Sequence, residues 1–185
     1  VSGYDLAFST PLYTAADFAL ASNVVASASR TDAGTTNMGL TNTSFVNNNT
    51  NFDEVTFIVT DGYQKINPID VTVTITEHSD TVNYDGEVHT VTGYDVAISN
   101  LLYTEADFSF DGSASVSGTD AGTYPMNLAS DNFENRNNNF ANVTFNIEDG
   151  QLVIKKINAV VTVTEKSAEM DYDGQPHTIS GYASM

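Results

Sequence analysis

The sequence is poor in cysteine, tryptophan, basic residues and long apolar runs. Its 185 residues contain no cysteine, which excludes a disulfide framework and thiolate metal sites. Lysine and arginine number only 6 against 24 aspartates and glutamates, so the formal net charge is -18. This charge repels phosphate backbones and anionic lipids, which argues against nucleic acid and membrane-surface partners. No stretch approaches the roughly 18 apolar residues of a membrane helix, and no signal segment opens the chain, so we expect no membrane contact by this segment.

What the chain does contain is one pattern written twice. The two copies are 88 residues apart over most of their length, and the first copy is two residues longer somewhere between Phe18 and Asp32. A period of this size is that of a whole folding unit, whereas solenoid and propeller repeats have periods of 20 to 50 residues. The positions that define the pattern are Asp32 and Gly34, which return as Asp120 and Gly122, and Tyr84, Asp85, Gly86 and His89, which return as Tyr172, Asp173, Gly174 and His177.

The local pattern predicts β structure throughout. Val71, Val73 and Ile75 alternate with threonines, and residues 143–148 alternate in the same way, which is typical of strands with one buried face. Asp85-Gly86 and Asp149-Gly150 predict tight hairpins between neighbouring strands. Only residues 14–17 and 104–107 favour a short capped helical turn. We therefore expect an all-β protein of tandem antiparallel sandwich modules, with at most one short helical turn per module.

The domain boundaries allow two divisions. The favoured division gives a partial β module at 1–66, a complete module at 67–157 and the start of a third repeat at 158–185, because Pro68 makes the junction short and stiff. The alternative division gives units 1–90 and 91–178. In the favoured division the terminal modules are incomplete, and an unpaired strand edge can accept a strand from another chain. Neighbouring repeats of the same protein are thus expected partners, and self-association through strand donation is a further hypothesis beside a permuted domain or an arbitrary boundary.

The repeated run Tyr-Asp-Gly-x-x-His-Thr-[VI]-[ST]-Gly-Tyr, at residues 84–94 and 172–182, resembles the MBG-like or YDG-type tandem repeats of bacterial surface proteins. The motif Thr-Asp-Ala-Gly-Thr and a closing Asp-Gly strand belong to the same resemblance, which covers essentially the whole chain. It implies Ig-like β repeats in cell-wall-anchored or secreted adhesins of Firmicutes, and hence an extracellular location at the bacterial cell surface. It implies a stalk or adhesive role and no particular ligand.

The residues offer little for catalysis or cofactors. His89 and His177 have no second histidine or cysteine nearby in sequence, so we expect each to bond a turn carboxylate such as Asp85. No Gly-x-Ser-x-Gly elbow is present, and we predict that the protein is not an enzyme. The only calcium candidates are Asp53 and Glu54, whose counterparts in the second copy are alanine and asparagine, so no cofactor is predicted and the asparagine-rich tracts are expected to hold their own turns.

Two further hypotheses concern function and covalent chemistry. The favoured function is a structural stalk or spacer of a large extracellular, fibre-forming or surface protein, and the alternative is an adhesin module that grips glycan or host protein. Lys65 and either Lys155 or Lys156 stand at matching places near the junctions. This suggests a lysine to asparagine amide cross-link as one hypothesis, and exposed junction lysines are the simpler interpretation.

Overall fold

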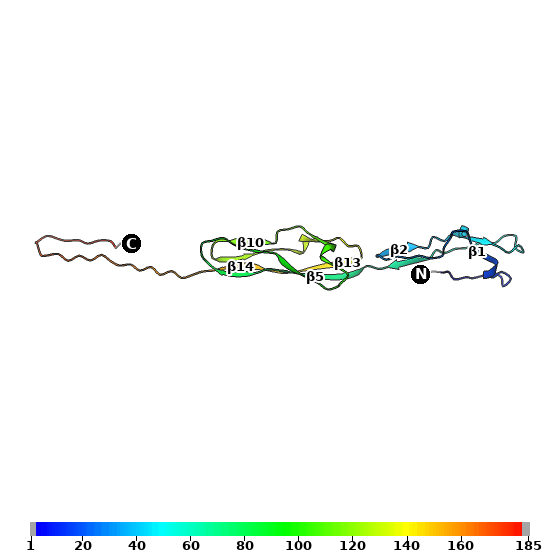
Figure 1. The fold of residues 1–185 in the computed structure, drawn as a ribbon, viewed down its shortest axis with the longest axis horizontal. Helices are drawn as coiled ribbons and strands as arrows, with labels where there is room; N and C mark the ends of the chain where they lie inside the picture. The colour runs from blue at the N-terminus through cyan, green and yellow to red at the C-terminus, as the bar shows by residue number, and fades with distance from the viewer. Residues whose placement is uncertain (1–2, 183–185) are drawn as a thin grey trace.

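The computed structural model describes residues 3–182, which lie in an elongated row of three parts (Figure 1). We name these parts the N-terminal unit (residues 3–66), the central unit (residues 69–155) and the C-terminal segment (residues 157–182). Residues 1–2 and 183–185, at the ends of the predicted first and third domains, lie outside the described residues. Within residues 3–182, no helix is long and apolar enough to cross a membrane.

The N-terminal unit contains short strands and single 3-10 turns. Two antiparallel pairs, β1 with β3 and β2 with β4, account for its sheets. Its elements in chain order are η1 (Ala15–Asp17), β1 (Phe18–Leu20), β2 (Gly34–Asn37), η2 (Asn42–Ser44), β3 (Phe45–Asn47) and β4 (Tyr63–Ile66).

The central unit contains the remaining strands. Its long strands follow the alternating apolar runs seen in the sequence. Its elements are β5 (Ile69–Glu77), β6 (Asp80–Asn83), β7 (His89–Thr92), β8 (Tyr94–Ile98), η3 (Glu105–Asp107), β9 (Phe108–Phe110), β10 (Ser115–Gly118), β11 (Gly122–Pro125), η4 (Ser130–Asn132), β12 (Phe133–Asn135), β13 (Phe140–Glu148) and β14 (Gln151–Lys155).

All-β structure is as expected, and so are the turns η1 and η3, each begun by a threonine. The expectation of at most one short helical turn per module is wrong, because η2 and η4 add a second 3-10 turn to each unit, where the side chains of Ser44 and Asn132 accept from the Thr41 and Ala129 amides. The sheet topology differs from the expectation of purely antiparallel pairing. β5 lies between β13, to which it is parallel, and β8, to which it is antiparallel. β14 lies between β11 and β6 and is parallel to β6. Parallel neighbours far apart in sequence leave no local signal, because the alternating pattern fixes which face is buried but not which strand lies alongside.

Both predicted Asp-Gly hairpins are wrong. The strands on either side of Asp85-Gly86 are β6 and β7, which belong to different sheets, and the same is true of β13 and β14 around Asp149-Gly150. Each Asp-Gly pair therefore turns the chain from one sheet to another. Gly86 has a positive φ of 84°, as such a corner favours, while Gly150 is glycine for lack of space, since an added Cβ would meet the backbone of His78.

The apolar core lies in the central unit. Val73 and Ile75 of β5 are fully buried, and they pack with the buried residues of β7, β12, β13 and β14 and with Tyr103. In the N-terminal unit only four apolar side chains are classed as buried: Tyr13, Phe18, Ala28 and Leu40. Aromatic contacts fill much of that unit instead, among them Phe18 against Phe45 and Phe57. The two units thus use equivalent residues but reach different degrees of burial.

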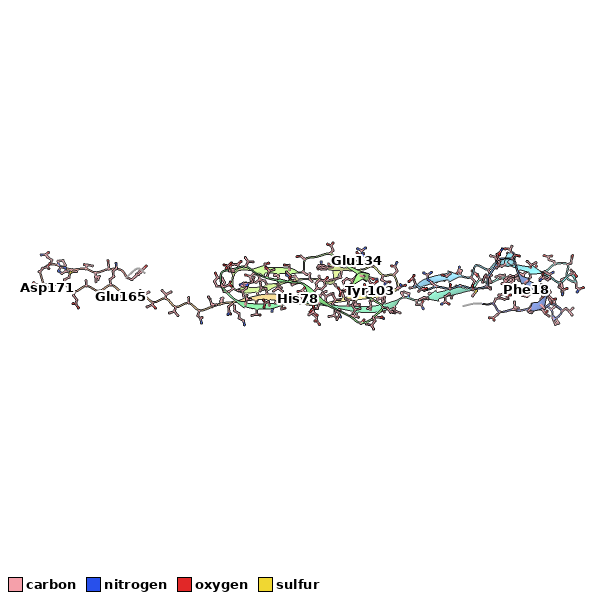
Figure 2. All side chains as sticks on the ribbon, in the orientation of Figure 1. Phe18, His78, Tyr103, Glu134, Glu165 and Asp171 are labelled. Carbon is pink, nitrogen blue, oxygen red and sulfur yellow. The ribbon has the colours of Figure 1, made fainter. Side chains whose placement is uncertain are left out.

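The C-terminal segment runs outward from the central unit and folds back on itself (Figure 1). An isolated antiparallel bridge joins Glu165 to Tyr182 in it. Figure 2 shows Glu165 and Asp171 on this segment, well away from Tyr103 in the central unit and Phe18 in the N-terminal unit. Its apolar side chains are exposed, with Val161 83% and Val163 65% accessible.

Equivalent hydrogen bonds locate the two extra residues of the first copy. Leu20 pairs with Phe45 as Phe110 pairs with Phe133, and the Gly3 amide donates to Ala26 as the Gly93 amide donates to Ala114. Leu20 and its equivalent Phe110 are 90 residues apart, whereas Ala26 and its equivalent Ala114 are 88 residues apart. The insertion therefore lies between Leu20 and Ala26, at a turn where Asn23 has a positive φ of 67°.

Candidate functional site

The turns at Asp85-Gly86 and Asp173-Gly174 each hold an imidazole against a carboxylate. His89 Nε2 lies 2.9 Å from Asp85 Oδ1, and the Glu87 amide donates to the same oxygen. The amide bond, and then the histidine, lower the pKa of Asp85. The repeat residues Tyr172, Asp173, Gly174 and His177 form the same corner, with His177 2.9 Å from Asp173. These bonds hold a turn in shape, as expected, and Tyr84 and Tyr172 are exposed beside them.

The asparagine-rich tracts at residues 47–51 and 135–139 hold their own turns, as expected. In the central unit the side-chain oxygen of Asn135 accepts from the Asn137 amide, and that of Asn137 accepts from the Asn139 amide. Tyr103 donates its hydroxyl to Asn135, which ties the tract to the core. The same ladder runs through Asn47, Asn49 and Asn51 in the N-terminal unit, with Tyr13 in the place of Tyr103. The first asparagines of each tract are therefore used by the protein itself.

The calcium candidates Asp53 and Glu54 follow the first tract and are both exposed. Across residues 3–182, no group of three histidine, cysteine or acidic side chains is close enough to hold a metal ion. The prediction that Lys65 is equivalent to Lys155 or Lys156 is wrong. Lys65 stands opposite Thr35, and the equivalent position opposite Thr123 is Val153, because the offset is 88 there.

The last asparagine of the second tract joins the two units. Asn139 accepts a hydrogen bond from the Ala33 amide at 2.6 Å and donates to the Asp32 carboxylate at 3.1 Å. Its carbonyl oxygen accepts from the amide of Ile69, the first residue of β5. We call the two bonds from Asn139 to Ala33 and Asp32 the junction latch, since the bond to Ile69 lies within the central unit. It assigns a role to Asp32 of the repeated Asp-Ala-Gly-Thr motif that its sequence could not reveal, because the partner is 107 residues away.

The motif itself is shaped differently in the two units. In the N-terminal unit the Arg30 guanidinium donates to the carbonyls of Asp32 and Ala33, and Gly34, at φ +133°, leaves it room. In the central unit Gly118 replaces the arginine, and the Tyr124 ring lies over it while its hydroxyl donates to the Asp120 carbonyl. Gly122 lies beside the same ring. Both arrangements fix the Asp-Ala loop of their unit. In the N-terminal unit the first two residues of this loop, Asp32 and Ala33, face Asn139 of the central unit.

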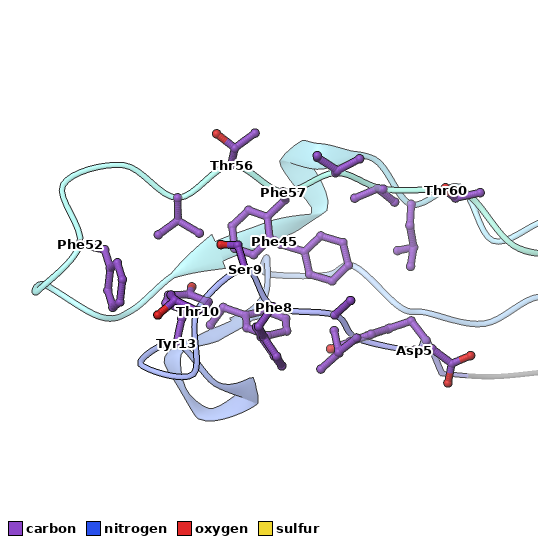
Figure 3. Close-up of a pocket in the computed structure, with 18 of the residues that line it drawn as sticks. Asp5, Phe8, Ser9, Thr10, Tyr13, Phe45, Phe52, Thr56, Phe57 and Thr60 are labelled. Atoms are coloured by element: carbon purple, nitrogen blue, oxygen red, sulfur yellow. The ribbon is translucent and has the colours of Figure 1, made fainter.

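A long cleft opens in the N-terminal unit, and Figure 3 shows its two walls. Residues 4–10 form one wall and residues 54–60 the other, and the aromatic rings of Phe18, Phe45 and Phe52 also line the cleft. Its volume is about 590 Å³. Residues 4–8 are equivalent to β8, and residues 55–60 are equivalent to the end of β13. In the central unit those two strands flank β5, so the cleft is the position of a missing central strand.

Residues 55–60 have no strand assignment although their sequence alternates like β13. A strand is defined by its partner, and the described residues of the N-terminal unit supply no counterpart of β5. Counterparts of β6 and β7 are likewise missing there, which leaves β2 and β4 as a lone pair where the central unit has three strands. We call this position the open slot.

Glu77 is the site residue that the sequence did not single out. It is only 4% exposed at the end of β5, and its carboxylate accepts from the amides of Leu128 at 2.6 Å and Gly150 at 2.7 Å. In the N-terminal unit the equivalent amide, that of Leu40, is bonded by Asp61 instead. The signal in the sequence is a glutamate two residues after Ile75, and hence on the same apolar face of β5, which is repeated as Glu165.

No family model matches this chain, and no curated protein or solved structure matches it with significance.

Proposed function

We propose that this chain is a structural spacer, built from Ig-like β modules joined in tandem to project or connect other parts of a larger protein. The observation that carries the proposal is the junction latch. Asn139 accepts from the Ala33 amide and donates to the Asp32 carboxylate in the preceding unit. Two directional hydrogen bonds restrict the orientation of one unit relative to the other more than one bond would.

The link between the units is short as well as bonded. β4 ends at Ile66 and β5 begins at Ile69, so only Asn67 and Pro68 lie between strands. Proline restricts φ and removes one source of bending. A two-residue link plus the latch favours a rod over a flexible string, and the row of parts in Figure 1 is consistent with that shape.

The parts of the latch are repeated along the chain. Asp120 and Ala121 of the central unit stand where Asp32 and Ala33 stand in the N-terminal unit, and Asn51 stands where Asn139 stands. Each unit therefore has an asparagine at one end and an Asp-Ala loop at the other. This arrangement supports a series of identical joints, in which length is added by copying one unit.

Location is proposed from charge and resemblance. The MBG-like or YDG-type resemblance places such repeats in adhesins at the bacterial cell surface, and the strongly acidic composition suits a solvated stalk that does not associate with nucleic acid. We propose an extracellular, cell-surface location on those grounds.

The test is the stiffness of the junction in a dilute, monomeric sample. Because the chain has no cysteine, spin labels can be attached at Val46→Cys in the N-terminal unit and Thr123→Cys in the central unit. We expect a narrow distance distribution by pulsed electron paramagnetic resonance, which broadens in Asn139→Ala. The matched control Asn51→Ala removes the same side chain from the equivalent ladder without touching this junction. A distribution in the parent that is already as broad as in Asn139→Ala would overturn the spacer proposal.

A further inference from the structure

We propose that β5 and β6 at the start of the central unit, paired with β13 and β14 at its end, form a load-bearing clamp that resists unfolding when the chain is pulled lengthwise. This inference rests on the proposed spacer function and deepens it, since it names tension along the row of units as the load that the spacer carries.

The first and last strands run side by side in the same direction along the central unit. β5 and then β6 lead away from the junction, and β13 and then β14 are parallel to them. Val71 pairs with Val143 in one sheet, and Val82 pairs with Ile154 in the other, with 72 residues between partners in both. The two stretches of chain therefore pass from one sheet to the other together and without a change of register.

Side-chain hydrogen bonds connect the two stretches where they change sheets. Thr76 donates its hydroxyl to Glu148 at 2.7 Å, and the Ser79 hydroxyl accepts from the Gln151 amide at 3.1 Å. Between these two bonds, the buried carboxylate of Glu77 accepts from an amide of the corner that joins β13 to β14. The first and last strands are thus bonded to each other before, within and after the change of sheet.

Tension along the chain loads this pair lengthwise. The N-terminal unit precedes β5 at one end of the central unit, and the C-terminal segment leaves β14 at the other (Figure 1). Pulling these ends apart slides β5 and β6 against β13 and β14, so that the evenly spaced hydrogen bonds of the parallel pairs share the load. Because forced unfolding is governed by the barrier to unfolding, a load shared among many bonds should require a higher force.

Parallel pairing is the feature that produces this geometry. If the first and last strands were antiparallel neighbours, the chain would enter and leave the unit at the same end, and tension would separate them one bond at a time. The observed parallel partners instead place entry and exit at opposite ends. The same pairing therefore suits both a row of units and resistance to tension.

The first test pulls the full chain in two directions by single-molecule force spectroscopy. Because the chain has no cysteine, handles can be attached to cysteines introduced at exposed positions. Asn67→Cys with Lys156→Cys applies the load lengthwise, whereas Glu87→Cys with Lys156→Cys separates β6 from β14 sideways. At one loading rate we expect the lengthwise unfolding force to be at least about twice the sideways force. Equal forces, or a higher sideways force, would overturn the clamp.

The second test removes one bond from the clamp. Ser79→Ala deletes the acceptor of the Gln151 amide, and the matched control Ser117→Ala deletes a hydroxyl that bonds Thr90 between the inner strands β7 and β10. Both serines are exposed, so the two variants should have similar stability in urea. At a fixed lengthwise force, Ser79→Ala should unfold about fivefold faster than the parent, and Ser117→Ala should stay within about twofold of it.

The same unfolding rate in both serine variants would contradict the clamp. Neither test depends on the width of the distance distribution across the junction, because both follow unfolding within the central unit. A stiff junction beside a central unit that unfolds equally in both directions would overturn the clamp and leave the spacer proposal standing. A broad distance distribution beside a strong lengthwise clamp would do the reverse.

Discussion

Removal of the buried carboxylate at the end of β5 is the sharpest test of the central unit. Glu77→Ala leaves the amides of Leu128 and Gly150 buried without an acceptor. An unsatisfied buried donor costs about 1–3 kcal/mol, so we expect the free energy of unfolding to fall by about 2–6 kcal/mol. This is a large part of the stability of a module of this size, which is of order 5–15 kcal/mol.

The assay is urea denaturation followed by circular dichroism, combined with amide hydrogen exchange at Leu128 and Gly150. Glu77→Gln keeps one accepting oxygen and should lose about half as much stability, about 1–3 kcal/mol. Glu165→Ala is the matched control, because in a dilute monomer Glu165 is exposed and its loss should change stability by less than about 0.5 kcal/mol. A similarly small change for Glu77→Ala, with both amides still protected, would refute the role assigned to this carboxylate.

Three other predictions concern the central unit. Tyr103→Phe removes the hydroxyl that donates to Asn135 and should lower the free energy of unfolding by about 1 kcal/mol, which urea denaturation measures; no change would show that the bond is not formed in solution. A hydrogen bond to the Thr92 carbonyl, and then Asp95, raise the pKa of His78 above its ordinary 6.5. The contribution of protonated His78 to the free energy of unfolding is therefore complete below pH 6.5 and is lost as the pH rises through the raised pKa. Urea denaturation at a series of pH values should show this loss in the parent and not in His78→Gln. Because the Asn135 side chain is engaged by the protein's own backbone, chelation of calcium should leave the melting temperature unchanged, and a fall on adding chelator would contradict this.

The sequence predicted the elements of the fold better than their partners. The alternation around Val73 predicts β5, and Thr14, three residues before Asp17, predicts a single capped turn. Both predictions are confirmed because both signals are local. The sequence does not predict the parallel neighbours of β5 and β14, because the residues of a strand do not specify which strand pairs with it. Asp149-Gly150 predicts a hairpin, and the prediction is wrong because a corner between sheets uses the same residues as a tight turn within one.

The candidate site was predictable only in outline. The incomplete first unit suggested an unpaired edge, but the cleft between residues 4–10 and 54–60 depends on where the neighbouring strands lie. The bonds from Asn139 to Asp32 and from Glu77 to Leu128 join residues far apart in sequence, so neither could be read from spacing. The repetition of Glu77 as Glu165 was visible, and its place on an apolar face was the signal that a buried role existed.

Amide hydrogen exchange along the chain tests the central claim, a fixed junction beside a complete central unit, most directly. We expect slow exchange in the central unit and at the Ala33 amide, which donates to Asn139, and fast exchange in residues 55–60 and 157–182, whose amides have few partners in the structure. Fast exchange at Ala33 that is the same in the parent and in Asn139→Ala, or fast exchange in the buried strands of the central unit, would contradict the account.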